Sequence, residues 1–335
     1  MYTERSCASA VGTCDQMSGA GERILIIKLG ALGDFVQALG PMAAIRRHHT
    51  GASLVLLTSK PYVELARATG LFDDVWVDEE RPKAWQIGRA RRLRQKILSG
   101  AFTRIYDLQT SDRSSFYFHL LSPLWGSGKR PEWSGIARGC SHPHNDPERN
   151  KVHTIERQKQ QLAAAGIYDV PMPDLSFADK DVSAFGIEKP YALLVAGGAP
   201  HRPAKRWPAE RFADLANRLY AQGVTPVLLG TRAEQGILAL IECDAPGTVN
   251  LCGKTDFIDI AVLARGAALS VGNDTGPMHM ISLAGCTSVV LYSFDSDPAL
   301  CAQRGPSVKI LRKESLVELS VDDVWDAARR IAALP

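Results

Sequence analysis

The sequence predicts an α/β protein built from two doubly wound, Rossmann-like domains that face an interdomain cleft. Short apolar runs rich in β-formers alternate with stretches of helical periodicity, and this alternation occurs twice, before and after a Pro-Met-Pro segment at 171–173. Such alternation is typical of crossover units that build a parallel sheet with helices on both faces. The length of 335 residues, 45% of them hydrophobic, suits two domains of about 150 residues each.

The first alternation runs from Arg23 to Gly166. Its predicted strands are Ile24–Leu29, Ser53–Thr58, Asp74–Val77 and Arg104–Asp107. Its predicted helices are Phe35–Arg47, Pro61–Thr69, Ala84–Leu98 and a stretch near His153–Gly166. Residues 122–150 break the rhythm with Pro, Gly, Ser and Asn, so we expect loops there, and long loops in compact domains are often functional.

A linker region from Pro171 to Pro190 precedes the second alternation. The predicted strands are Tyr191–Val195, Thr225–Leu229, Thr248–Leu251, Leu269–Val271 and Ser288–Tyr292. The predicted helices are Ala209–Gln222, Glu234–Cys243, Phe257–Arg265, Met278–Ala284 and a last amphipathic helix through Ala333, with Ser320 as its cap. We therefore expect domains at residues 23–175 and 176–335, after a flexible tail at residues 1–22.

The composition excludes several classes of protein. The net charge of +3 and the pI near 8.4 are mild and give no argument for a nucleic-acid partner. The seven cysteines are widely spaced and form no C-x-x-C pair, which favours free thiols in a reducing cytoplasm over zinc or redox chemistry. No stretch approaches the ~20 apolar residues of a membrane span, and residues 1–22 lack the apolar middle of a signal peptide. We expect a cytoplasmic protein.

Asp34 is the first candidate site residue. It follows the apolar run Ile24–Leu29 and a turn from Gly30 to Gly33, and it stands at the start of a helical stretch. Unpaired N–H groups and the helix dipole keep a carboxylate ionised at such a position. At the carboxyl end of a parallel strand it also faces any ligand cleft. Asp34 can therefore serve as a helix cap, as a catalytic base, or as both.

The run Gly-Asn-Asp-Thr-Gly-Pro-Met-His at 272–279 is the second candidate cluster. A strand ends where the run begins, and its proline suits the first turn of a helix. Backbone N–H groups of Thr275 and Gly276 would then converge on an anion, and the helix dipole favours phosphate. Asp274 could cap that helix or accept hydrogen bonds from sugar hydroxyls. His279, about a turn further on, is either a site residue or a satisfied core histidine.

A loop at residues 196–208 supplies several cationic side chains after the strand Tyr191–Val195. It combines a Gly-Gly pair with the basic residues His201, Arg202, Lys205 and Arg206. Open sheets bind ligands beyond the carboxyl ends of their strands, and cations there suit a leaving diphosphate. Lys205 is the candidate phosphate contact, Arg206 could share that role, and a solvated surface side chain is the alternative.

Four motifs occur in order along the chain: Lys-Leu-Gly-Ala-Leu-Gly-Asp at 28–34, Lys-Arg-Trp-Pro at 205–208, Leu-Gly-Thr-Arg-Ala-Glu at 229–234 and Gly-Asn-Asp-Thr-Gly-Pro-Met-His at 272–279. Together they resemble glycosyltransferase family 9, the lipopolysaccharide core heptosyltransferases. The resemblance extends from about Arg23 to the C-terminal helix. It implies the GT-B fold, an acceptor-binding N-terminal domain, an ADP-heptose-type donor in the C-terminal domain, and inverting transfer with no bound metal and no cofactor.

The resemblance also implies roles for residues at the matching positions. Asp34 would be the general base, and Gln109 and Arg113 would line the acceptor side. The donor would be held by Lys205 at the diphosphate, Glu234 at the ribose, Asp274 at sugar hydroxyls, Thr275 and Gly276 through their N–H groups, and His279 beside the sugar phosphate. Inverting transfer needs one base and a stabiliser for the departing diphosphate, and the two half-sites would supply both.

Two further segments have alternative interpretations. Residues 81–104 contain eight basic and no acidic residues, which fits a solvated helix face or a contact with the anionic inner membrane or an acidic acceptor; the resemblance favours the contact. Asp295-Ser296-Asp297 matches the D-x-D pattern of metal-binding glycosyltransferases, but it also suits a turn after the strand Ser288–Tyr292.

The predicted function is therefore transfer of a heptose or a similar sugar from a nucleotide-diphosphate donor to a lipid-linked oligosaccharide acceptor. The enzyme would be cytoplasmic, in peripheral contact with the inner membrane, and would bind no nucleic acid. Three alternatives stay open on the sequence. They are an autotransporter heptosyltransferase that modifies protein hydroxyls, a sugar-nucleotide epimerase or hydrolase, and a nucleotide-sugar binding protein without turnover.

Overall fold

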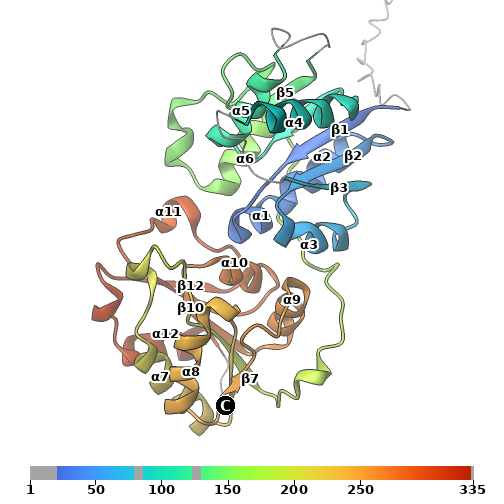
Figure 1. The fold of residues 1–335 in the computed structure, drawn as a ribbon. Helices are drawn as coiled ribbons and strands as arrows, with labels where there is room; N and C mark the ends of the chain where they lie inside the picture. Colours follow the sequence, from blue (N-terminus) through green and yellow to red (C-terminus); the bar gives the residue numbers. More distant parts are fainter. Residues whose placement is uncertain (1–20, 79–85, 123–129, 333–335) are drawn as a thin grey trace, which may run out of the picture.

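Two parallel sheets form the framework of the protein. The structure, a computed structural model, describes residues 21–78, 86–122 and 130–332. Within these ranges each sheet has six strands, in the orders β3-β2-β1-β4-β5-β6 and β12-β11-β10-β7-β8-β9. Counted from the first strand of each sheet, both orders are 3-2-1-4-5-6, the order of the doubly wound dinucleotide-binding fold. The two sheets lie one above the other in Figure 1, so the predicted fold class is confirmed.

The first sheet consists of β1 (Arg23–Ile27), β2 (Ser53–Thr58), β3 (Asp74–Val77), β4 (Arg104–Asp107), β5 (Glu132–Gly135) and β6 (His142–Pro143). Its helices are α1 (Leu32–Gln37), α2 (Leu39–His48), α3 (Val63–Ala68), α4 (Ile87–Ser99), α5 (Asp112–Leu120) and α6 (Thr154–Ala163). Central strand β1 is apolar throughout because both faces are covered. Ile24 and Ile26 pack with α1, α2 and α6, whereas Leu25 and Ile27 pack with α4 and α5.

The second sheet repeats this plan with β7 (Tyr191–Val195), β8 (Thr225–Leu228), β9 (Val249–Asn250), β10 (Leu269–Asn273), β11 (Ser288–Tyr292) and β12 (Val308–Arg312). Its helices are α7 (Ala209–Ala221), α8 (Gln235–Asp244), α9 (Phe257–Gly266), α10 (Gly276–Leu283), α11 (Pro298–Cys301) and α12 (Val321–Ile331). Alternate residues of β7 again face opposite layers. Leu194 packs with α7, α8 and α12, and Leu193 packs with α9 and α10.

The single helix expected over Phe35–Arg47 is instead two helices, α1 and α2. Pro41 explains the break, because its ring nitrogen has no hydrogen to donate to the carbonyl of Gln37, four residues earlier. α1 therefore ends at Gln37, and α2 begins at Leu39 with Pro41 in its first turn, where the missing N–H costs nothing. This break gives the Asp34-bearing segment a short helix of its own.

The loops expected over residues 122–150 are only partly correct. β5 and β6 lie in this segment and extend the first sheet, each parallel to its neighbour. Four and two residues are too short to show a strand pattern, so pairing along the sheet edge, and not local sequence, makes these strands. Helices α5 and α11 and strand β12 also lie outside the predicted elements. Residues 123–129 fall outside the described ranges.

The remaining expectations concern the chain ends and the cysteines. Ser320 caps α12 as predicted, since its hydroxyl accepts the N–H of Asp323 at 3.1 Å. The cysteines in the described ranges are free thiols, as predicted, while Cys7 and Cys14 lie outside them. Of the predicted tail at 1–22, only Gly21 and Glu22 are described. None of the helices in the described ranges is long and apolar enough to span a membrane.

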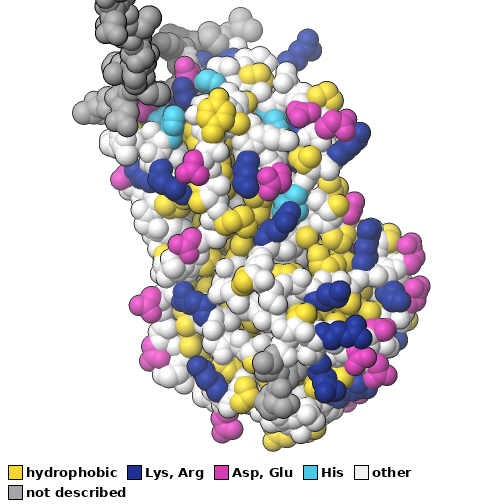
Figure 2. All heavy atoms as spheres, turned by 180° about the vertical axis from the view of Figure 1, so that it is seen from behind, with side chains coloured by type: hydrophobic (Ala, Val, Ile, Leu, Met, Phe, Trp, Pro, Cys, Tyr) yellow, Lys and Arg dark blue, Asp and Glu magenta, His cyan; other side chains and the backbone are white. Residues whose placement is uncertain are grey.

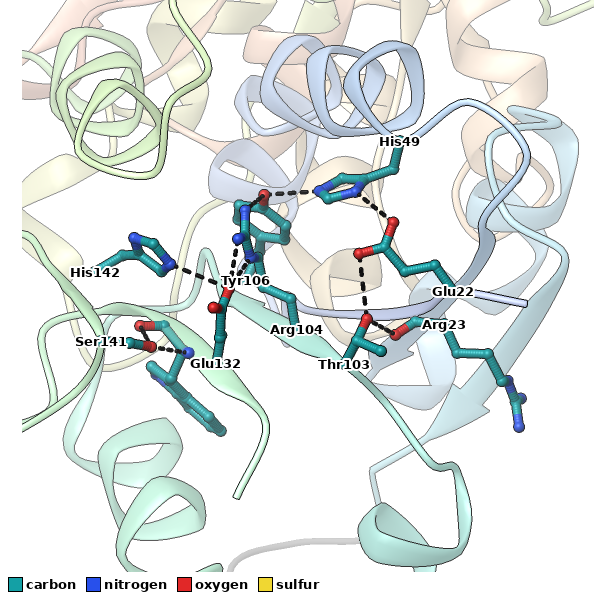
Figure 3. A network of polar contacts seen from close by, with 10 residues as sticks. Glu22, Arg23, His49, Thr103, Arg104, Tyr106, Glu132, Ser141 and His142 are labelled. Carbon is teal, nitrogen blue, oxygen red and sulfur yellow. Dashed lines mark hydrogen bonds and ion pairs between the residues drawn. The ribbon is translucent and has the colours of Figure 1, made fainter. Parts of the chain in front are cut away.

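A polar network ties the amino ends of the first sheet together, as Figure 3 shows. His49, at the end of α2, bonds the Glu22 carboxylate at 3.1 Å and the Tyr106 hydroxyl at 2.8 Å. Arg104 bonds the same hydroxyl at 3.3 Å and the Glu132 carboxylate at 2.7 Å. Burial lowers the pKa of His49, although Glu22 opposes the shift. The network fixes the edge opposite the cleft and leaves the carboxyl edge to the site.

Tyr106→Phe should lower the free energy of unfolding by about 1–3 kcal/mol. The substitution leaves the buried Nε2 atom of His49 without its partner, and an unpaired buried polar group costs about that much. Urea unfolding would measure the change. The matched control is Tyr168→Phe at a residue 81% exposed, which should stay within about 0.5 kcal/mol of the parent. Equal stability of both variants would contradict a structural role for the network.

Candidate active site

The carboxyl ends of the two sheets meet where α1 contacts α10 (Figure 1). Two glycines permit this contact. A Cβ atom on Gly33 would lie 2.5 Å from Cδ2 of His279, and one on Gly276 would lie 2.7 Å from Cβ of Leu32. Distances under 3 Å are not tolerated between such atoms, so both positions need glycine. The contact brings the turn after β1 against the turn after β10, which are the two segments singled out in the sequence.

Asp34 stands in the first turn of α1 with an exposed side chain. It does not cap the helix, because no side-chain bond caps α1 and the N-cap position is Ala31. Its carboxylate has no hydrogen-bond or ion-pair partner among the described residues. The sequence left two roles open, helix cap and catalytic base. The structure does not show the cap, and the carboxylate is free to contact a ligand.

A polar pocket of about 180 Å³ lies beside Asp34 in the first half of the chain. Its walls come from the segments that follow β1 and β4, the residues just before α6 and α6 itself, and its lining includes Lys28, Gln109, Arg149, Arg157 and Gln161. Gln109 is fixed by the N–H of Leu29, which donates to its Oε1 atom at 2.8 Å. The predicted acceptor residue Gln109 thus lies in one pocket with Asp34.

Several buried polar atoms around this pocket have no hydrogen-bond partner in the described structure. They are Nε and Nη2 of Arg149, Oε1 of Gln158 and Oδ2 of Asp107. Burial raises the pKa of Asp107 to about 6, although hydrogen bonds and Lys28 oppose the shift. Lys28, buried and bonded to the carbonyl of Leu108 at 3.0 Å, has its pKa lowered by burial. The unpaired donors of Arg149, with the guanidinium group of Arg157 in the same lining, fit an anionic ligand.

Arg113, the second predicted acceptor residue, lies apart from that pocket lining. It stands in α5, where its guanidinium pairs with the buried carboxylate of Asp78 at 2.7 Å and donates to the hydroxyl of Tyr117 at 2.8 Å. The Asp78 side chain is only 2% exposed, whereas the Arg113 side chain is 30% exposed, so the arginine covers a buried carboxylate. The structure therefore does not bring Arg113 together with Asp34 and Gln109.

On the other side of the contact, Lys205 and Asp274 form a buried ion pair. The Lys205 ammonium lies 2.6 Å from Oδ2 of Asp274, and the two side chains are 11% and 6% exposed. Asp274 also accepts from Ser296 at 2.7 Å and from Gln303 at 3.1 Å. Burial alone would raise the pKa of Asp274, but these hydrogen bonds and the ammonium hold it below its usual value. Asp274 is therefore a fixed anion, and it is no helix cap.

The start of α10 presents its backbone to the same space. Gly276 and Pro277 occupy the first turn, and the N-cap residue Thr275 makes no side-chain cap. The N–H groups of a first helical turn have no acceptor within the helix, so this end attracts an anion. The buried Thr275 hydroxyl has no partner in the described structure either. These groups agree with the predicted phosphate contacts.

Glu234 lies against the glycine loop that follows β7. One oxygen accepts the N–H of Gly198 at 2.9 Å, and the other accepts the N–H and the hydroxyl of Thr231 at 2.8 and 2.9 Å. A Cβ atom on Gly197 would lie 1.7 Å from the same carboxylate, so the loop needs glycine there. Arg206 donates to the carbonyl of Gly198. Hydrogen bonds thus link the glycine loop to both the Glu234 carboxylate and the Arg206 side chain.

His279 connects the two halves. Its Nδ1 atom lies 2.9 Å from the amide nitrogen of Gln37, and its ring packs on the backbone at Gly33. Burial lowers its pKa to about 4, with Asp274 and Asp34 opposing the shift. The sequence left open whether His279 is a site residue or a satisfied core histidine. The imidazole is buried and hydrogen-bonded, and it also borders Asp34 and Asp274.

The Asp295-Ser296-Asp297 segment does not form a metal site. Asp295 pairs with Arg202 at 2.9 Å, and Asp297 caps α11 by accepting the N–H of Ala299 at 3.0 Å. No cluster of three or more metal-ligating side chains exists in the parts of the chain that the structure describes. The middle residue, Ser296, is the one that reaches Asp274.

Sequence reasoning missed the site contacts made by Ser296, Gln303, Gln37, Arg149 and Arg157. No local signal marks Gln303 or Gln37, because their partners lie 29 and 242 residues away in the chain. Arg149 and Arg157 lie within or beside the segment interpreted as loops. The unusual length of that segment was the one feature of the sequence that indicated function there.

Comparison with known proteins extends the likeness beyond motifs. The family model "Glycosyltransferase family 9 (heptosyltransferase)" matches residues 90–315. Lipopolysaccharide heptosyltransferase 2 of Escherichia coli K12 is 31% identical over 257 residues, which cover 68% of this chain and 70% of that protein. Among solved structures, E. coli ADP-heptose LPS heptosyltransferase II is similar with a TM-score of 0.74 at 19% identity, covering 91% of this chain and 97% of that one.

A family 9 glycosyl transferase from Veillonella parvula DSM 2008 has a TM-score of 0.76 at 18% identity, over 92% of this chain and 96% of that one. At these low identities the two solved structures support the fold alone, and it is the GT-B fold expected from the motifs. The family model spans well over half of the chain. The chain belongs to glycosyltransferase family 9.

Proposed function

We propose that this glycosyltransferase moves a heptose from ADP-heptose to the inner core of a lipopolysaccharide acceptor, with inversion at the anomeric carbon. The two E. coli relatives named above are heptosyltransferases of lipopolysaccharide. The proposal rests chiefly on Asp34, an exposed carboxylate without a partner in the described chain, next to the start of α10. Residues 23–175 would bind the acceptor, and residues 176–335 would bind the donor.

The proposed step transfers one proton, forms one glycosidic bond and breaks one bond to the diphosphate. Asp34 takes the proton of an acceptor hydroxyl, and the oxygen attacks the anomeric carbon on the face opposite the diphosphate. The bond between that carbon and the diphosphate oxygen breaks, and ADP leaves with the electron pair. Because the transition state resembles an oxocarbenium ion, negative charge develops on the leaving group and needs fixed positive partners.

The residues around α10 would supply these partners. The N–H groups of Thr275 and Gly276 and the helix dipole would face the diphosphate. Lys205 uses one of its three ammonium protons for Asp274, and the others would serve the phosphate oxygens. Asp274 would accept hydrogen bonds from sugar hydroxyls. Glu234, fixed by backbone N–H groups, would use its remaining lone pairs for the ribose.

The pocket beside Asp34 would hold the acceptor. Gln109 borders the base, and the unpaired Arg149 donors with Arg157 would bind an anionic group of the inner core. That group would anchor the acceptor so that a neighbouring hydroxyl reaches Asp34. Arg113 stays a predicted acceptor residue whose guanidinium is already paired with Asp78.

Asp34→Asn should lower kcat for heptose transfer by at least 100-fold while the KM for ADP-heptose changes little. The amide cannot take the hydroxyl proton, and a positioned base contributes about 10²–10⁴ in rate. ADP release from ADP-heptose would be followed with lipid A–Kdo acceptors that carry or lack a first heptose. The matched control, Asp112→Asn, also alters an exposed aspartate in a first helical turn and should keep full activity.

Other outcomes of this assay decide between functions. Unchanged turnover by Asp34→Asn would refute the general-base role. Transfer to a protein hydroxyl and not to lipid A–Kdo would identify an autotransporter heptosyltransferase. A changed sugar nucleotide without acceptor would indicate an epimerase or hydrolase, and ADP-heptose binding without any product would indicate a binding protein.

Arg149→Gln should raise the KM for the acceptor about 10- to 100-fold and leave the KM for ADP-heptose unchanged. The variant removes a charged donor, and a hydrogen bond to a charged group contributes about 1.5–3 kcal/mol. Steady-state kinetics with each substrate varied in turn would separate the two effects. Arg138→Gln, an exposed arginine outside the pocket, is the control. An equal rise in both KM values would contradict an acceptor-specific role.

We further propose that the protein works at the cytoplasmic face of the inner membrane, with α4 as its contact surface. α4 carries Arg89, Arg91, Arg92, Arg94 and Lys96 and no acidic residue, and Ile87 at its start is 59% exposed. An anionic leaflet attracts such a helix by about 1 kcal/mol for each basic residue near it. On the opposite side of the molecule, basic and acidic side chains are interspersed (Figure 2).

The double variant Arg91→Glu/Arg92→Glu should bind vesicles at least 10-fold more weakly than the parent chain when they contain phosphatidylglycerol. The two exposed side chains would then repel the leaflet. Co-sedimentation at low salt would measure binding, with phosphatidylcholine vesicles as the neutral comparison. The double variant Arg329→Glu/Arg330→Glu makes the same charge change on α12 and should bind as the parent does. Equal loss in both variants would contradict a specific role for α4.

A further inference from the structure

One buried side-chain hydrogen bond joins the helix that carries Asp34 to the helix that begins at the donor site. The amide nitrogen of Gln37, the last residue of α1, lies 2.9 Å from Nδ1 of His279 in α10. Gln37 is 1% exposed and His279 is 7% exposed. A buried polar pair of this kind, 242 residues apart in the chain, is costly to leave unsatisfied.

The ring of His279 has little freedom. A Cβ atom on Gly33 would lie 2.5 Å from Cδ2 and 3.0 Å from Nε2 of the imidazole, so the ring edge with Nε2 rests on the backbone one residue before Asp34. Within the described chain, Nε2 makes no hydrogen bond. The same helix begins three residues earlier at Gly276, whose N–H belongs to the proposed diphosphate site. His279 therefore lies one turn from the proposed diphosphate site, with the Nε2 edge of its ring against the segment that carries Asp34.

The neutral imidazole carries one proton, and its partner at Nδ1 determines where that proton lies. The charged and titratable groups that face the ring are Asp34 on α1, Asp274 after β10, Lys205 before α7 and His153 before α6. Since the Gln37 nitrogen donates to Nδ1, Nδ1 has no proton and Nε2 is the N–H. An acceptor at position 37 would reverse this and expose the lone pair of Nε2.

We infer that Gln37 is a positioning residue, which holds the His279 ring so that its Nε2–H is a hydrogen-bond donor to a diphosphate oxygen of the sugar nucleotide. The inference deepens the proposed function and rests on it for the identity of the ligand. Phosphate oxygens are acceptors only, so a lone pair on Nε2 would repel them. Because the bond spans α1 and α10, the same contact sets the position of Asp34 relative to the bound donor.

The test compares Gln37→Glu with Gln37→Met. The glutamate accepts from Nδ1–H, so the neutral ring should carry its proton on Nδ1, and its pKa should rise because a carboxylate now stabilises the imidazolium. Below that new pKa both nitrogens carry protons and the donor at Nε2 returns. Gln37→Glu should therefore bind ADP at least 10-fold more weakly than wild type at pH 8.5 and regain affinity toward pH 6. Gln37→Met should lose affinity about equally at both pH values.

Two readouts keep the inference separate from the identity of the reaction. Nitrogen NMR of histidine-labelled full-length protein, with His279→Asn to assign the signal, should show Nε2–H in wild type and Nδ1–H in Gln37→Glu at high pH. Calorimetry with ADP alone measures binding without any acceptor, so failure of heptose transfer would refute the proposed function and leave this test intact. Gln222→Glu, at an exposed position after α7, is the matched control and should bind ADP as wild type does.

Either of two results would overturn the inference. If Gln37→Glu and Gln37→Met both bind ADP with the wild-type affinity from pH 6 to pH 8.5, Gln37 does not position a diphosphate donor. The inference also fails if the wild-type ring carries its proton on Nδ1. A folded Gln37→Met variant suffices for the affinity test if the glutamate variant does not fold.

Discussion

The close approach of α1 and α10 is the constraint on which the rest of the site depends. Two glycines face each other's helix at this crossing, and a methyl group on either would come within 2.7 Å of the other helix. Wider spacing would move Asp34 away from the start of α10 by about the thickness of a side chain. The stack of Tyr62 on Phe35 and on Phe257 of α9, with ring centres 5.2 and 5.9 Å apart, supports the contact beside the crossing.

On the proposed donor side, the charged groups hold one another in place. Asp274 is held by three partners, Lys205, Ser296 and Gln303, and its lowered pKa keeps it ionised at neutral pH. An ion pair this deeply buried contributes little net stability, because both charges lose their water. Its benefit is geometric: fixed charges and dipoles need no reorganisation when the leaving group becomes negative. The proposed acceptor side differs, since Nε and Nη2 of Arg149 have no partner in the described structure.

The sequence predicts the parts of this molecule that local physics determines. Fully buried strands such as Ser53–Thr58 and Tyr191–Val195 have the bounds that their apolar runs indicate, and the four motifs identify the family and bring Asp274 and Lys205 to one place. The sequence does not predict what tertiary structure decides. β6 is a strand only because β5 lies beside it, and Gln303 reaches Asp274 only because β11 and the following loop fold back over the site. Pro41 can be seen in the sequence, but the apolar residues on both sides of it keep helical spacing. This spacing concealed the break between the two helices.

The identical strand order of the two sheets has an evolutionary consequence. Each half is a complete doubly wound unit with its own loops, so the loops after β4 to β6 can change without disturbing those after β7, β8 and β10. Substrate preferences on the two sides can thus diverge separately among relatives. Residues that link the halves are the exception. A larger side chain at Gly33 or Gly276 needs a compensating change in the opposite half, and His153 and Thr154 bond the carbonyls of Ala302 and Leu300.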